Sequence, residues 1–144
     1  MSTALKVKKA LVNAIGQHPT FRNRLVSLGH PGSDAELEMV FVTGIRSNES
    51  SRMLGKAYRR EELTVELGVV AETLGNDLED THERAYLMLQ GVQEAVYEDS
   101  SLGGIVHLAE VVTWDERSFN GPERTVVEIS IEVRVLADFD GTES

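Results

Sequence analysis

Four histidines are the first residues in this sequence that could do chemistry, since imidazole can transfer protons near neutral pH or bind a metal. His30 lies in a Gly-His-Pro-Gly turn, and His107 lies in a predicted strand. One hypothesis is therefore a small cytoplasmic α+β enzyme that uses His30 or His107 with nearby acids. His82 falls on the apolar stripe of a predicted helix, where a structural role is expected. No histidine has a second ligand at metal-site spacing, so we expect no metal and no cofactor.

The other residue types that carry chemistry are also without a catalytic pattern. The 24 acids follow predicted helix and strand surfaces, and no pair has the unequal, water-shielded settings that acid–base catalysis needs. Gly103-Gly104 follows a helix instead of opening one, which indicates helix termination and not phosphate binding. The sequence has no cysteine, so disulfides and thiol nucleophiles are excluded. We expect no catalytic residue and a chain that is not an enzyme.

A polar, basic stretch is the stronger candidate for binding. Residues 47–60 read SNESSRMLGKAYRR, which is longer than a hairpin needs. Loops of this length in compact domains are usually functional or mobile. Met53, Leu54 and Tyr58 are apolar side chains within this polar loop. Such side chains either order against a partner or fold back onto their own domain, and both readings stay open.

Charge is divided unevenly along the chain. The net charge is −10, but residues 1–60 carry ten Lys or Arg against four acids, and residues 61–144 carry four against twenty. The two parts thus balance at +6 and −16, which indicates either a two-signed surface or chance clustering on a solvated one. The acidic total and the lack of a recognised motif disfavour dedicated binding to duplex DNA.

The elements that must position these residues are predicted by periodicity. The 144 residues suit one domain, with a loop at 47–60 and a loose acidic tail at 138–144. Leu78, His82, Ala85 and Leu89 recur at spacings of four and three, which predicts a helix from Asp77 to Asp99. A shorter helix is predicted over residues 3–17. No stretch is apolar enough to span a membrane, and no signal peptide is recognisable.

Alternating apolar residues predict the strands. We expect strands over residues 36–46, 61–72, 105–116 and 125–136, and a short one near Leu25. In the first of these Ile45 is expected on the face of Met39 and Phe41, and in the third Val112 and Trp114 are expected on one face. The predicted fold is α+β: one mainly antiparallel or mixed sheet of about four or five strands, with two helices packed on one face.

Several motifs in this order resemble the tail terminator proteins of long-tailed, siphovirus-type bacteriophages. They are Gly29-His30-Pro31-Gly32 leading into ELEMVFVTGI, the basic loop ending YRREEL, the helix DTHERAYLMLQGVQEAVYEDSSLGG, and the closing VEISIEVRVLADF. Together they cover most of the chain. Leu102-Gly103-Gly104 after the long helix is the most specific of them.

This resemblance implies a structural virion protein with no catalytic residue. Such a protein forms a ring, commonly a homohexamer, at the head-proximal end of the tail, after assembly in the host cytoplasm. The ring caps the tail tube, stops its polymerisation and docks the head-side connector, while DNA passes through without being read. The implied partners are further copies of itself, the tail tube protein and the connector or stopper protein, with no membrane. Another head–tail connector or tail completion protein is the alternative.

A ring of this kind joins two different surfaces of each subunit, which the charge division would make complementary. We expect the subunit or tail-tube interface to include a positive and apolar side and a negative side. The predicted residues are Arg46, Arg52, Met53, Leu54, Lys56, Tyr58, Arg59 and Arg60 on the first side, and Glu128 and Glu132 on the second, with Glu94 and Glu98 as alternatives to these acids.

Overall fold

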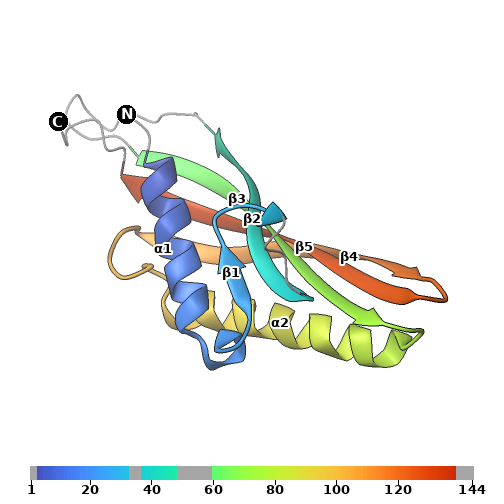
Figure 1. Ribbon diagram of the computed structural model, residues 1–144. Coiled ribbons are helices and arrows are strands. Elements are labelled where there is room, and N and C mark those ends of the chain that lie inside the picture. The colour runs from blue at the N-terminus through green and yellow to red at the C-terminus, as the bar shows by residue number, and fades with distance from the viewer. Residues whose placement is uncertain (1–2, 33–36, 49–59, 139–144) are drawn as a thin grey trace.

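Two helices cover one face of a five-stranded sheet (Figure 1). The computed structural model describes residues 3–32, 37–48 and 60–138. The α+β class, the mainly antiparallel sheet and the two helices on one face are confirmed. In chain order the elements are α1 (Ala4–Gln17), the 3-10 helix η1 (Pro19–Phe21), β1 (Leu25–Ser27), β2 (Glu38–Asn48), β3 (Arg60–Leu74), α2 (Leu78–Glu98), β4 (Leu108–Asn120) and β5 (Arg124–Asp138).

The sheet has the strand order β1-β2-β3-β5-β4. Among the described strands only the β1–β2 pair is parallel, and β3 and β5 form the longest ladder, from Arg60 opposite Asp138 to Leu74 opposite Arg124. β4 lies at one edge, since among the described strands it pairs with β5 alone. β2 lies inside the sheet as predicted, although β1 covers only Met39–Phe41 of it. Neither described helix is long and apolar enough to cross a membrane.

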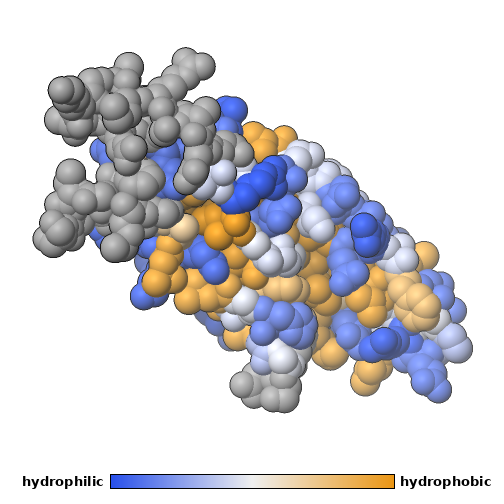
Figure 2. Space-filling model, turned by 90° about the horizontal axis from the view of Figure 1, so that it is seen from above, coloured by the Kyte–Doolittle hydropathy of each residue, from blue (hydrophilic) through white to orange (hydrophobic). Residues whose placement is uncertain are grey.

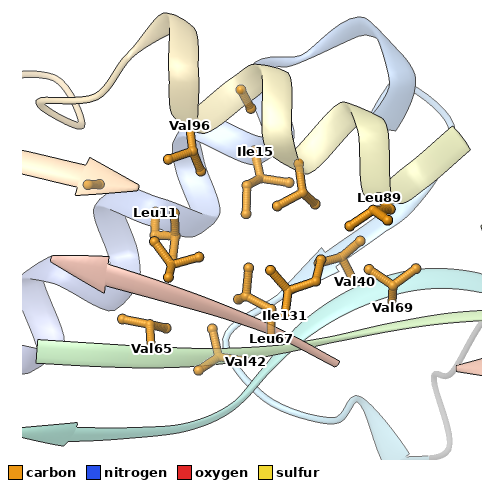
Figure 3. Close-up of a cluster of buried hydrophobic side chains, with 14 of the residues drawn as sticks. Leu11, Ile15, Val40, Val42, Val65, Leu67, Val69, Leu89, Val96 and Ile131 are labelled. Carbon is orange, nitrogen blue, oxygen red and sulfur yellow. The ribbon is translucent and has the colours of Figure 1, made fainter. Parts of the chain in front are cut away.

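The main core lies between the helices and the sheet (Figure 3). Alternate residues of β5 from Val127 to Val135 are fully buried, which confirms the inward face expected from their period of two. The helices meet them with Leu11 and Ile15 of α1 and with Val92 of α2. Each such side chain contributes about 1.5–3 kcal/mol on burial, so this layer fixes the helices on the sheet.

Two β-bulges change which side chains face the helices. The register shifts by one residue between Val42 and Gly44 in β2, and between Val111 and Thr113 in β4. An extra residue in one strand turns all later side chains to the other face. Ile45 therefore packs on the main core and not on the face of Met39 and Phe41, where the alternation placed it.

The bulge in β4 corrects the prediction for that strand in the same way. Val112 and Trp114 were expected to share a face, but Val112 is the inserted residue. Beyond it Trp114 stands opposite Ile131 on the helix side, and its ring meets Tyr86 of α2 with centroids 5.7 Å apart. The strand also begins at Leu108, three residues later than expected.

A capping side chain begins α2, and the two glycines expected to end it follow its last turn. The Asp77 side chain accepts a hydrogen bond from the backbone N–H of Asp80 at 3.2 Å, as a helix cap does. Beyond the other end Gly103 and Gly104 have φ of 72° and 86°, the left-handed region that favours glycine. Leu102 beside them is buried at 3% exposure, so it anchors this corner in the core.

The sheet face away from the helices is mostly polar. Figure 2 looks at the molecule from above and shows hydrophilic residues spread over this side with hydrophobic ones between them. A small second core of Met39, Phe41 and Val70 lies here, where β2 and β3 meet. The remainder of this outer face is available for contacts with water or with other chains.

Candidate functional site

Arg46 and Glu132 lie together on the outer face of one chain. Arg46 of β2 has its guanidinium nitrogens 3.6 Å from a carboxylate oxygen of Glu66 and 3.7 Å from one of Glu132. The three side chains are all partly exposed, so this contact is weak and is screened by salt. Two residues predicted for opposite sides of a subunit contact are thus already neighbours in the folded chain.

Glu128 lies on the same face, further along β5. It is exposed and stands opposite Arg117 of β4 in the antiparallel register. Near the other end of β5, Arg134 forms an ion pair with Glu110 of β4. The outer face therefore carries both signs in cross-strand pairs, and it is not the uniformly negative surface that the acids of β5 alone would suggest.

The other predicted interface residues belong to the β2–β3 connection. Ser47 and Asn48 belong to β2, and Arg60 is the first residue of β3. Residues 49–59 lie outside the described residues, and with them Arg52, Met53, Leu54, Lys56, Tyr58 and Arg59. The acidic tail beyond Asp138 lies outside them too. The interface predicted on this segment stays a prediction.

His30 and His107, the candidates for an enzyme, are not brought together. His30 accepts a hydrogen bond from the backbone N–H of Gly32 at 3.0 Å, and its ring meets Phe41 of β2 at a centroid distance of 5.0 Å. His107 contacts Asp138 at 2.9 Å, beside the start of β4. Because β2 and β4 are separated by β3 and β5 in the sheet, the two histidines cannot act on one substrate atom.

A polar cluster between α2 and β4 is a feature that sequence reasoning missed. Glu116 of β4 accepts a hydrogen bond from the Tyr86 hydroxyl and contacts His82 Nε2 at 3.1 Å. His82 Nδ1 lies 2.8 Å from the carbonyl oxygen of Leu78. Both ring nitrogens face acceptors, which the doubly protonated imidazolium satisfies best. The spacing of His82 and Tyr86 indicated one helix face, but nothing in the sequence identified Glu116 as their partner.

These contacts shift three pKa values. The hydrogen bond to the Leu78 carbonyl, aided by Glu116, raises the pKa of His82, although desolvation opposes it. The hydrogen bond to Glu116 raises the pKa of Tyr86, and the same bond lowers the pKa of Glu116. The cluster thus favours a charged histidine beside a charged carboxylate, which clamps α2 to β4.

The arrangement supports contacts more than catalysis. Within the described ranges no group of three or more histidines and acids is placed to hold a metal ion. The buried carboxylate of Glu61 has a structural use, since it accepts hydrogen bonds from Thr3 at the start of α1 and from Ser47 of β2. What the described surface does offer is a free edge strand, β4, with exposed Leu108, Val112 and Trp114.

The fold is similar to that of a chain in a known virion structure. No family model matches the chain, and no curated protein matches it. A chain of a solved structure, the virion of a native gene transfer agent particle, is similar at 11% identity and a TM-score of 0.49. The match covers 88% of this chain and 84% of that one.

Proposed function

We propose that the chain is a structural protein of a phage-type virion, and that within the virion it acts as a tail terminator. The proposal starts from the sequence resemblance, which runs through most of the chain in one order. The observation in the structure that supports it most is the edge strand β4, which pairs with β5 alone among the described strands. Leu108, Val112 and Trp114 on that edge are 43%, 48% and 41% exposed, and contiguous exposed apolar side chains usually mark a contact with another protein.

In this proposal the subunits join head to tail into a closed ring, a homohexamer by the family resemblance. A ring of this kind needs two different surfaces on each subunit. The chain has an exposed edge strand on one side of its sheet and β1 and β2 on the other. The ring would cap the last layer of the tail tube, stop its polymerisation and dock the head-side connector while DNA passes through.

The charges suit such a channel and such contacts. The net charge of −10 keeps DNA from adhering to a passage through which it must slide. Since Arg46 already contacts Glu66 and Glu132 of its own sheet, the positive side of the subunit contact falls to Arg52, Lys56, Arg59 and Arg60. Glu94 and Glu98 are both exposed on α2, and Glu94 already contacts His18 Nε2 at 3.0 Å, so Glu98 is the first candidate of the two to meet a neighbour.

The assembly state of the purified protein tests this proposal first. Sedimentation velocity and negative-stain images should show closed rings, and six chains of 15.9 kDa would weigh about 95 kDa. A protein that stays monomeric at every concentration, or that forms open filaments, would contradict the ring. Another connector or tail completion protein would also form rings, so the two roles are separated by tail length, which only a terminator controls.

A further inference from the structure

A groove between α2 and β4 hollows the described surface. Its volume is about 760 Å³. The second half of α2 forms one wall with Val96 and Tyr97, and the first half of β4 forms the other with Val111, Val112 and Trp114. Tyr97 is 86% exposed and Trp114 is 41% exposed, so large apolar surfaces face water here.

The walls of the groove predict the chemistry of its occupant. Its charged lining residues, among those described, are two acids. Glu94 on α2 also contacts His18 Nε2 at 3.0 Å, and Glu110 on β4 also pairs with Arg134. The Ala109 N–H at the start of this edge already donates to the Ser100 carbonyl at 2.7 Å. Beyond Ala109, the edge of β4 that no described strand covers presents backbone N–H and C=O groups, which an added extended chain can bind. The complementary partner is thus an extended segment that carries both apolar and basic side chains.

The sequence contains one segment of that composition outside the described residues. Residues 49–59, ESSRMLGKAYR, have three basic residues against one acid, with Met53, Leu54 and Tyr58 among them. Residues 139–144 have one aromatic residue, two acids and no base, so their charge does not match. We infer that the groove between α2 and β4 binds residues 49–59 of a second copy of this chain.

The sheet register explains why the segment comes from a second copy. Both ends of the segment are tethered to adjacent strands, at Asn48 and Arg60, so its midpoint reaches about 20 Å at most. Trp114 stands opposite Ile131, which stands opposite Leu67, seven positions along β3 from Arg60. That is about 24 Å along the strand, with two strand spacings of about 4.8 Å across it. A tether of this length could span to the Leu108 end of the groove of its own chain, but it is too short to span to the Trp114 end.

This inference deepens the proposed ring, because it supplies the contact between neighbouring subunits. It rests on that proposed function for the biological role of the contact, and on the groove itself for the binding. A segment of one subunit in the groove of the next makes a head-to-tail contact, since the two surfaces differ. The acids of the groove walls would orient the basic segment as it approaches.

Cysteine cross-linking tests the inference directly, because the natural chain has no cysteine. One full-length copy carries Leu54→Cys, and a second, with a tag of different size, carries Val112→Cys in the groove. After mild oxidation of the mixture, the mixed disulfide should form several-fold more than in a control. The control pairs Leu54→Cys with Ser130→Cys, an exposed position on the outer sheet face. A double variant, Leu54→Cys/Val112→Cys, reports whether the link forms within one chain.

Each outcome has a meaning when sedimentation is recorded on the same samples. Equal yields of mixed disulfide at Val112→Cys and at Ser130→Cys overturn the proposal that the groove binds the segment. The ring proposal stands in that case if rings still form. A clear preference for Val112→Cys without rings supports the groove and counts against the terminator ring. A link that forms only within single chains of the double variant overturns the assignment to a second copy. If neither rings nor a preference for Val112→Cys is seen, both the groove contact and the ring proposal are overturned.

Discussion

At the scale of single residues, His82 couples the fold to pH. Its pKa is raised in the folded state, so its stabilising effect is fully present below the unfolded pKa near 6.5 and is lost as pH rises through the folded pKa. His82→Gln removes this titration. Urea unfolding should therefore show a stability difference between parent and His82→Gln that is larger near pH 6 than near pH 8.5.

The partner of His82 sets the acid limit of the same effect. The pKa of Glu116 is lowered by Tyr86 and His82, so its contribution is present above the unfolded pKa and is lost as pH falls through the folded one. His30→Gln is the control, since His30 lies near β1 and β2 and does not contact this cluster. A His82→Gln difference that is flat between pH 6 and 8.5 would contradict the clamp.

Leu102 and Gly103 make the corner after α2 sensitive to substitution. Leu102→Ala should reduce the free energy of unfolding by about 2–4 kcal/mol, because the side chain is buried. Gly103→Val should cost about 1–3 kcal/mol from backbone strain alone, since φ is 72° and open space surrounds the added side chain. Gly16→Ala in α1, at a negative φ with open space, is the control for a glycine substitution. If both variants have the melting temperature of the parent, this corner does not anchor the fold.

At the scale of elements, the β2–β3 connection separates folding from assembly. Deletion of residues 50–56 removes no residue of β2 or β3, so the domain should keep its circular dichroism spectrum and cooperative melting. It also removes Arg52, Met53 and Leu54, and ring formation or tube capping should therefore fail. A Gly-Ser replacement of equal length distinguishes lost side chains from a shortened connection. Normal infectious particles from the deletion would rule out this role.

Most elements could be predicted because each carries its own period. β5 alternates without interruption, and α2 has a single apolar stripe with a cap and two terminal glycines, so their limits agree with the structure within two residues. The bulges at Thr43 and Val112 could not be predicted in this way. An inserted residue is stabilised by the neighbouring strand and leaves the local alternation unchanged, so Ile45 and Trp114 were assigned to the wrong neighbours.

The site was less accessible to sequence reasoning than the fold, for a related reason. The pair of Glu116 with His82 depends on how β4 lies across α2, 34 positions away in the chain. The groove arises in the same way from two elements that the sequence treats separately. Glu132 was expected on the outward face of its strand and Arg46 was grouped with the loop that follows β2, and their pairing follows from the order of β2, β3 and β5.

At the scale of the whole molecule, the division of charge should govern how subunits meet. Complementary charges set encounter rate and register, and exposed pairs contribute only about 0–1 kcal/mol each. Ring formation measured by sedimentation velocity should therefore weaken with added salt without being abolished. Arg59→Glu/Arg60→Glu should block assembly and leave a folded monomer, and Glu94→Lys/Glu98→Lys in the partner copy should partly restore it.

A charge change elsewhere is the matched control for that experiment. Lys9→Glu/Arg22→Glu alters the net charge by the same amount at exposed positions in α1 and beyond η1. This double variant should form rings like the parent. If rings are indifferent both to salt and to Arg59→Glu/Arg60→Glu, the uneven distribution of charge has a cause other than subunit contact.

The length of the tail tubes tests the central claim, that this chain terminates a tail. The gene is deleted from the genome that encodes the virion proteins. Tube lengths are then measured by negative-stain microscopy with and without the protein supplied in trans. A terminator predicts tubes of variable and excessive length without attached heads, and a return to uniform length on complementation. Tubes of normal, uniform length in its absence would contradict the account.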